Sequence, residues 1–188
     1  MRTHSIVVAS LLLFSAGPAL AAGKLKLTST DVKPNSTLPD KQVFDGMGCK
    51  GENLSPQLAW SNVPEGTKSF ALTVYDPDAP TGSGWWHWVV YNIPADATEL
   101  PTGAGSGKAK LPAGTVEGRT DFGKAGFGGA CPPPGDKPHR YIFTLTALKV
   151  DKLEVPPDAS AAMIGFMTHA NALGTATFTA KYGRPKEK

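Results

Sequence analysis

Short segments in which apolar and polar side chains alternate recur along the chain, and this pattern predicts a mainly β fold. In residues 69–75 the large apolar side chains Phe70, Leu72 and Val74 occupy every second position, as in a strand with one buried face. Residues 141–148 are apolar on both faces, which is typical of a strand inside a sheet. Shorter strands are expected at residues 24–30, 43–44, 58–60, 88–93 and 175–182.

Helical periodicity comes late in the chain. Asp158 is a suitable N-cap for a helix over about residues 159–172, and Gly174 is a suitable stop. The expected apolar stripe of this helix consists of Met163, Ile164, Phe166 and Met167. Residues 95–130 are rich in glycine and have little periodicity, so they are expected to form a long irregular excursion with one short hairpin.

The N-terminus has the order of a secretory signal peptide. Arg2 precedes an apolar run at residues 6–14, and Ala19-Leu20-Ala21 forms a small-x-small cleavage site, so residues 1–21 are predicted to be removed. The run is too short for a membrane span, and no later segment is long and apolar enough to provide one. We therefore expect a single domain over residues 22–188, periplasmic or secreted, with no transmembrane span.

The charge balance gives no argument for a nucleic-acid partner or an anionic membrane. Removing Arg2 with the signal peptide leaves 18 basic and 16 acidic residues, a net charge of +2. This small excess does not favour a nucleic-acid partner or an anionic membrane.

The two cysteines allow two interpretations. An even count in an exported chain favours a disulfide between Cys49 and Cys131, which would close a loop of 131 − 49 = 82 residues. The alternative is that Cys131, which is close to His139 in the sequence, is a catalytic thiol.

Groups able to bind a ligand gather in two proline-rich loops. The first follows the strand at residues 69–75 and contains Asp76, Asp78 and, after two glycines, His87. The second loop leads into the strand at residues 141–148 and supplies the remaining groups, His139, Arg140 and Tyr141. Two imidazoles and a phenol can donate hydrogen bonds to an oxyanion, and a nearby carboxylate favours a charged imidazole. The alternative for the two aspartates is that they only form turns.

Other kinds of chemistry lack their sequence patterns. His87, His139 and an aspartate do not have the spacing of a zinc or calcium motif, so no metal is expected. Ser83 lies in Thr-Gly-Ser-Gly-Trp, which is not the Gly-x-Ser-x-Gly of a nucleophile elbow. No phosphate-cradling glycine loop of the nucleotide-binding kind is present, and no cofactor is expected.

Taken together, these segments resemble the phosphatidylethanolamine-binding protein family, specifically its bacterial Raf-kinase-inhibitor-like branch. The resemblance covers most of the mature chain, in family order. It rests on five segments: GENLSPQLAW (residues 51–60), DPDAP (76–80), WHW ahead of VVYNIP (86–94), DFGKAGFGG (121–129) and CPPPGDKPHRYIF (131–143).

The resemblance implies a β-sheet fold with long loops, one late helix and a small pocket for anionic groups. By position, the implied ligand-binding residues are Asp76, Asp78, His87, Gly129, Pro133, His139 and Tyr141, with Asp78 bracing the loop. Trp86 stands where eukaryotic relatives tend to have a second histidine, and it is expected to make the pocket mouth more apolar.

The expected function is binding, without catalysis, of a small anionic ligand or a phospholipid head group. Two alternatives stay open: an inhibitor of a partner protease or kinase-like enzyme, and a hydrolase of phosphoesters or esters with Asp76 or a histidine as general base. The resemblance also leaves open a protein partner and a homodimer. An exported protein would not meet a cytosolic kinase, so kinase inhibition is not carried over.

Overall fold

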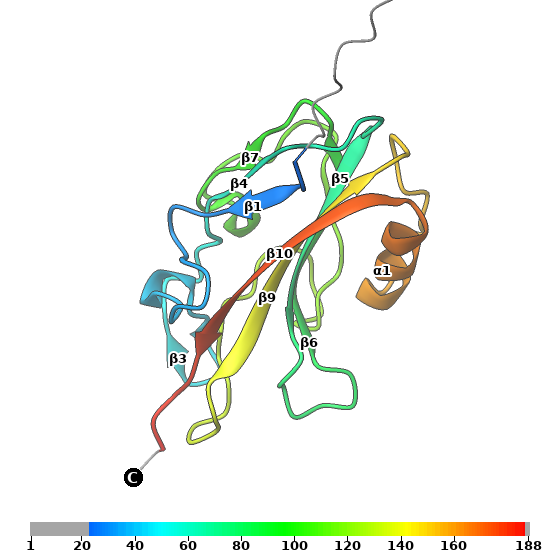
Figure 1. Cartoon of the computed structure of the whole chain (residues 1–188). Coiled ribbons are helices and arrows are strands. Elements are labelled where there is room, and N and C mark those ends of the chain that lie inside the picture. The colour runs from blue at the N-terminus through cyan, green and yellow to red at the C-terminus, as the bar shows by residue number, and fades with distance from the viewer. Residues whose placement is uncertain (1–22, 187–188) are drawn as a thin grey trace, which may run out of the picture.

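A five-stranded antiparallel sheet forms the centre of the molecule (Figure 1). The computed structural model describes residues 23–186; the predicted signal peptide lies outside the described residues. The order of strands across the sheet is β10, β9, β5, β6, β8. Their bounds are Ala172–Tyr182 for β10, His139–Leu148 for β9, Ser69–Asp76 for β5, Trp85–Pro94 for β6 and Val116–Glu117 for β8.

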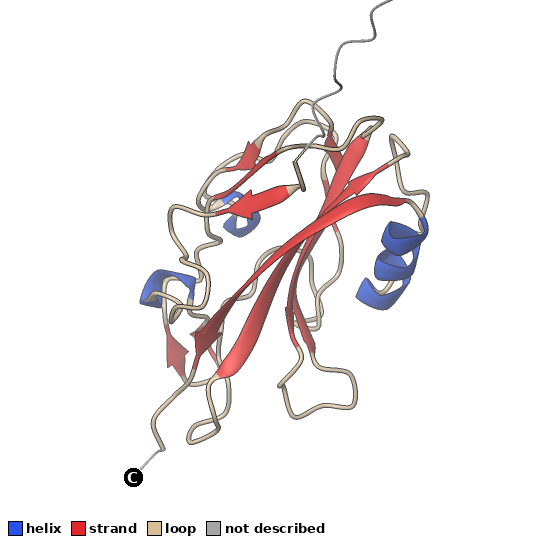
Figure 2. Cartoon of the chain, viewed as in Figure 1, coloured by secondary structure: helices blue, strands red, loops and turns tan. Residues whose placement is uncertain are grey.

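Two smaller sheets and one helix surround this central sheet. Strands β1 (Lys26–Thr28), β4 (Leu58–Ser61) and β7 (Glu99–Leu100) form a three-stranded sheet, and β2 (Asp45–Gly46) pairs with β3 (Cys49–Lys50). The α-helix α1 (Ala161–Ala170) lies on the other side of the central sheet from β1 and β4 (Figures 1 and 2). Two single 3-10 turns occupy Asp40–Gln42 and Ala104–Ser106. The predicted mainly β fold with one late helix is confirmed.

Alternate side chains of β5 point to opposite faces of the central sheet and belong to two separate apolar clusters. Phe70, Leu72 and Val74 of β5 belong to the large cluster between the central sheet and the three-stranded sheet. Ala71 belongs to the smaller cluster beneath α1. Because both faces of β5 are covered, burial of apolar side chains fixes its register on both sides.

The excursion at residues 95–130 is folded back onto the sheets. Its two short strands do not pair with each other, as the predicted hairpin requires: β7 pairs with β4, and β8 pairs with β6. Gly105 lies against the indole of Trp88, and a Cβ at this position would overlap the ring. Glycine therefore permits the close approach of this segment to the core.

Several boundaries differ from the sequence prediction. Val43 forms an isolated bridge to Ala130, so no strand occupies residues 43–44. Ser160 caps α1 in place of Asp158, because its hydroxyl accepts a hydrogen bond from the Met163 N–H. Gly174 does not end the helix: it lies in β10, beside a register shift.

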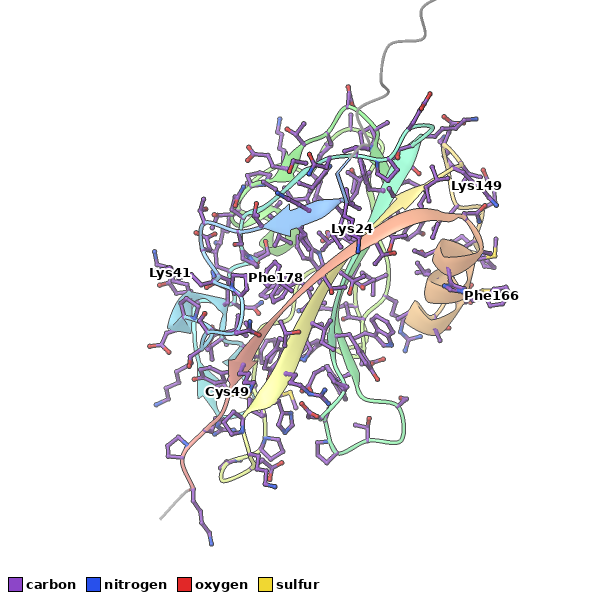
Figure 3. All side chains as sticks on the ribbon, viewed as in Figure 1. Lys24, Lys41, Cys49, Lys149, Phe166 and Phe178 are labelled. Atoms are coloured by element: carbon purple, nitrogen blue, oxygen red, sulfur yellow. A yellow bond between two sulfur atoms is a disulfide. The ribbon has the colours of Figure 1, made fainter. Side chains whose placement is uncertain are left out.

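The predicted apolar stripe of the helix is half right: Ile164 and Met167 pack in and against the smaller cluster, whereas Met163 and Phe166 are exposed. Ile164 is buried, but Phe166 is 72% exposed and points away from the body of the protein (Figure 3). Met163 is also exposed. The face toward the sheet also contains Ala161, Gly165 and Thr168, and the last two line a hollow between the helix and the sheet.

The structure contains the predicted disulfide between Cys49 and Cys131, whose Cα atoms are 5.9 Å apart. It joins β3 to the segment that precedes β9, so it closes a loop of 82 residues that includes β4, β5 and β6. A catalytic thiol at Cys131 is thereby excluded in this state, since the sulfur is bonded to another sulfur. Among residues 23–186, no helix has the length and apolarity needed to cross a membrane.

Replacing Gly165 by alanine is expected to stabilise the protein by about 0.5–1 kcal/mol, because alanine is the better helix former. A Cβ at Gly165 would meet no atom within 4 Å, so the new methyl group causes no clash. The measurement is urea unfolding followed by circular dichroism. Gly105→Ala is the matched control and should destabilise, because its Cβ would overlap Trp88. A loss of stability in Gly165→Ala would contradict the open space described here.

Removing the disulfide with the double substitution Cys49→Ser and Cys131→Ser is expected to lower the free energy of unfolding by about 4–5 kcal/mol, the chain-entropy value for a loop of this size. The measurement compares urea midpoints of the variant and the oxidised protein. Reduced wild-type protein serves as the control and should match the double variant. An unchanged midpoint in both would mean that the disulfide does not restrict the unfolded chain.

Candidate functional site

The ends of β5, β6 and β9 meet at a cavity of about 190 Å³. Five of the predicted site residues line it: Asp76, His87, Pro133, His139 and Tyr141. Cys131 also lines it, so the disulfide ends at the cavity wall. The other lining residues are Met47, Ala79, Pro80, Thr81, Trp85, Phe122 and Pro132.

Asp76 and His139 form a buried pair at the base of the cavity. The imidazole Nδ1–H of His139 donates to Oδ2 of Asp76 at 2.8 Å. The other carboxylate oxygen, Oδ1, accepts the backbone N–H of Asp78 at 2.8 Å. Both oxygens of Asp76 are therefore engaged, and the carboxylate fixes the orientation of the His139 ring.

The other nitrogen of His139 faces a second carboxylate. Nε2 lies 3.6 Å from Oδ2 of Asp136, whose side chain is 45% exposed. This distance is too long for a good hydrogen bond but allows an ionic interaction when the imidazole is protonated. Asp136 thus competes with any anion that approaches His139 Nε2.

His87 lies at a β-bulge in β6, and this bulge lets its side chain line the cavity. Val74 pairs with Trp88 and Tyr75 pairs with Trp86, so His87 is the extra residue between them. Trp88 packs in the large core cluster and Trp86 packs against the opposite, helix-facing cluster. The bulge turns His87 to the same side of the sheet as Trp88, as bulges near functional sites often do.

The ring of His87 is held in a defined tautomer. Its Nδ1–H donates to the carbonyl oxygen of Gly128 at 2.7 Å, and a carbonyl can only accept. Nε2 makes no hydrogen bond of ordinary geometry in the described part of the chain. Burial lowers the pKa of His87, although the carbonyls of Gly128 and Gly129 and the carboxylates of Asp76 and Asp121 oppose the shift.

Tyr141 presents a buried hydroxyl at the cavity wall. Burial is the largest cause that raises the pKa of Tyr141, followed by the charge of Asp76; the Cys131 backbone opposes the shift. The hydroxyl is buried, yet it has no hydrogen-bond partner of ordinary geometry within residues 23–186. An unmet hydrogen bond of a buried group is costly, so this hydroxyl is available to a ligand oxygen.

Aromatic and proline side chains complete the walls. The ring of Phe122 packs edge-on against both Trp85 and His87, with centroids 5.4 Å apart in each case. Phe122 was not predicted as a site residue, although it lies in the segment 121–129 that resembles the family. Trp86, expected at the pocket mouth, packs on the helix side of the sheet; Trp85 takes that place.

Two predicted site residues lie outside the cavity lining. Asp78 forms an ion pair with the guanidinium of Arg140, whose Nη2 and Nε donate to the carboxylate at 2.7 and 2.8 Å. The Arg140 backbone N–H also donates to Asp78, at 2.9 Å, so Asp78 braces the first loop against β9. The N–H of Gly129 donates to the side-chain oxygen of Asn53 at 2.7 Å.

The residue types at the cavity restrict its chemistry. Among residues 23–186, no lysine or arginine lines it, so a positive charge there must come from an imidazole. No group of three or more histidine, cysteine or acidic side chains in the same range converges to hold a metal ion.

Comparison with known proteins identifies relatives over nearly the whole chain. The sequence model described as phosphatidylethanolamine-binding protein matches residues 28–183. The UPF0098 protein YbcL of Escherichia coli K12 is 55% identical over 179 residues, which are 95% of this chain and 97% of that protein. The UPF0098 protein YbhB of the same organism is 54% identical over 158 residues, 84% of this chain and 99% of that protein.

A solved structure of Escherichia coli YbcL, described as a new member of the mammalian PEBP family, has the same fold. Its TM-score to this chain is 0.82 at 57% identity, and the match covers 86% of this chain and 99% of that one. The sequence resemblance to the family is confirmed.

The Asp78–Arg140 ion pair should determine the pKa of the Asp78 carboxyl. Hydrogen bonding from the Arg140 side chain is the main cause that lowers the pKa of Asp78 to about 2. Because the folded pKa lies below the ordinary value, the pair stabilises the fold above about pH 4 and is lost as the pH falls toward 2.

In Arg140→Gln the pKa of Asp78 should therefore rise toward the ordinary value of about 3.9, as followed by NMR titration of the side-chain carboxyl. Lys137→Gln removes an exposed cation nearby and should leave that pKa near its starting value. If the pKa of Asp78 stays near 2 in Arg140→Gln, the guanidinium is not its cause.

Proposed function

The chain belongs to the phosphatidylethanolamine-binding protein family, and we propose that it is an exported protein that binds a small anionic group, such as a phosphate head group, without catalysis. The observation that carries this proposal is the buried Tyr141 hydroxyl, which has no hydrogen-bond partner of ordinary geometry within residues 23–186 and stands beside two imidazoles at one cavity. A ligand oxygen at that position would accept its hydrogen bond.

His139 would supply the positive charge. Asp76 holds its Nδ1–H, so Nε2 is the nitrogen that can donate to a ligand when the ring is protonated. The cavity walls of proline and aromatic side chains are rigid, which lowers the entropy lost on binding. Affinity should therefore depend on pH through the histidine proton.

Binding fits the cavity better than hydrolysis. Both oxygens of Asp76 already accept hydrogen bonds, which leaves a poor general base. Cys131 is oxidised, and the hydroxyl of Thr81, the one hydroxyl besides Tyr141 in the described lining, donates to the Gly84 carbonyl. An activated nucleophile is thus missing from the described lining.

Export is supported by two independent features of the chain. The first 21 residues have the order of a signal peptide, and the disulfide is a bond typical of oxidising compartments. The mass of the mature protein isolated from a periplasmic extract tests cleavage after Ala21.

Inorganic phosphate should bind more tightly at pH 5 than at pH 8, as measured by isothermal titration calorimetry, because a protonated imidazole donates a charge-assisted hydrogen bond to the anion. His139→Ala should weaken binding at least tenfold at pH 5, because a charge-assisted hydrogen bond is lost. His169→Ala is the matched control: this exposed histidine lies on α1, and its loss should change nothing.

Asp136→Asn should raise the phosphate affinity several-fold at pH 5, because it removes the carboxylate that faces His139 Nε2. Affinity that does not vary with pH, or that survives in His139→Ala, would overturn the proposed site. Turnover of phosphoesters or esters by the wild-type protein, lost in Asp76→Asn, would favour hydrolysis instead.

A further inference from the structure

We propose, on the premise of the anion site above, that the cavity selects an oxyanion that carries its own proton. A phosphomonoester or inorganic phosphate in its singly charged form would be preferred over a phosphodiester, sulfate or a doubly charged phosphate. The proposal rests on the fixed tautomer of His87 and on the charge of the cavity lining.

His87 offers a ligand an acceptor. Because its Nδ1–H is given to the Gly128 carbonyl, the neutral ring has its lone pair on Nε2. A second proton is opposed by burial among the rings of Phe122 and Tyr141. The titratable groups around it are Asp76 at the end of β5, Asp121 in the loop before Phe122, and His139 and Tyr141 on β9.

The other two polar groups offer donors. The Tyr141 hydroxyl has no hydrogen-bond partner of ordinary geometry in the described part of the chain, so its proton is available, and Nε2 of protonated His139 also carries a proton. The cavity therefore presents two donors and one acceptor to its ligand. A singly protonated phosphate matches this set, because its ionised oxygens accept from Tyr141 and His139 while its P–O–H donates to His87.

The charge of the lining favours a single negative charge on the ligand. Asp76 is the one carboxylate among the lining residues, and within residues 23–186 no lysine or arginine lines the cavity. With His139 protonated and His87 neutral, the lining has no net charge. Moving a doubly charged anion from water to such a site costs more than moving a singly charged one.

A phosphodiester cannot donate a hydrogen bond to His87. It has one negative charge but no P–O–H, so one of its oxygens would face the Nε2 lone pair and leave that acceptor unsatisfied. Sites that require a hydrogen bond from their ligand reject analogues that lack the donor. The bridging phosphate of an ordinary phospholipid is therefore the poorer ligand, and an unsubstituted terminal phosphate the better one.

The test is calorimetry of the oxidised wild-type protein with four probes at pH 5.5 and 7.5: inorganic phosphate, phosphoethanolamine, glycerophosphoethanolamine and sulfate. We expect the two probes with a free phosphate to bind roughly ten- to a hundredfold more tightly at pH 5.5 than the diester or sulfate. The advantage of phosphoethanolamine should shrink at pH 7.5, because a phosphomonoester, whose second pKa is about 6, has lost its P–O–H there.

His87→Asn supplies the matched variant. The asparagine amide can donate to the Gly128 carbonyl from about the position of Nδ1, but it has no group in place of Nε2. We expect this variant to bind monoester and diester with similar affinity, whereas His169→Asn keeps the wild-type preference. Equal affinities of all four probes in the wild-type protein overturn the selectivity and leave the proposed function standing.

Absence of binding by every probe overturns both proposals. If His87→Asn does not fold, the wild-type series still decides, together with ¹⁵N chemical shifts of the His87 ring at pH 7.5. These should report a proton on Nδ1 and none on Nε2, and the opposite tautomer overturns the selectivity. Phosphatidylcholine vesicles with and without phosphatidic acid then test whether the terminal phosphate belongs to a lipid. If it does, the protein should co-sediment with the vesicles that contain phosphatidic acid; if the ligand is soluble, it should sediment with neither.

Discussion

The cavity depends on the antiparallel pairing of β5 with β9. In this register Tyr75 faces Ile142, so the next residues along, Asp76 and Tyr141, reach the end of the sheet together. A slip of one residue would move every side chain of a strand to the other face. Burial of apolar side chains on both sides of β5 prevents such a slip, so the forces that hold the core also align the polar groups of the site.

A β-bulge in β6 places His87 at the cavity. A regular strand would alternate His87 and Trp88 across the sheet, but the bulge places them on the same side. The glycine-rich excursion then covers this end of the sheet and supplies the Gly128 carbonyl that holds the ring. Gly128 itself lies against Phe122, where a Cβ would overlap the aromatic ring. The bulge in β6 and the close approach of the excursion at Gly128 thus determine the orientation of the His87 ring.

Features that repeat along the sequence could be predicted, and features that depend on a single local exception could not. The alternation of Phe70, Leu72 and Val74 identified β5, and two cysteines left one disulfide within the chain. The bulge at His87 leaves no periodic trace, so the sequence pattern placed this histidine in a loop; the family resemblance, not the pattern, had placed Trp86 at the pocket mouth. The helix stripe was half right: Ile164 and Met167 pack toward the sheet, but Met163 and Phe166, which the pattern also placed there, are exposed.

Successive residues of the tripeptide His139-Arg140-Tyr141 point to opposite sides of β9, so the same three residues line the cavity and support the loop beside it. His139 and Tyr141 are buried at the cavity, while Arg140 points to the surface and holds Asp78. The backbone N–H of Asp78 in turn donates to Asp76, which orients His139. An exposed ion pair by itself contributes little to stability. Here it is linked through one backbone amide to a buried carboxylate whose position decides which nitrogen of His139 is left for other partners. The surface pair therefore matters more for the geometry of the imidazole than for the free energy of folding.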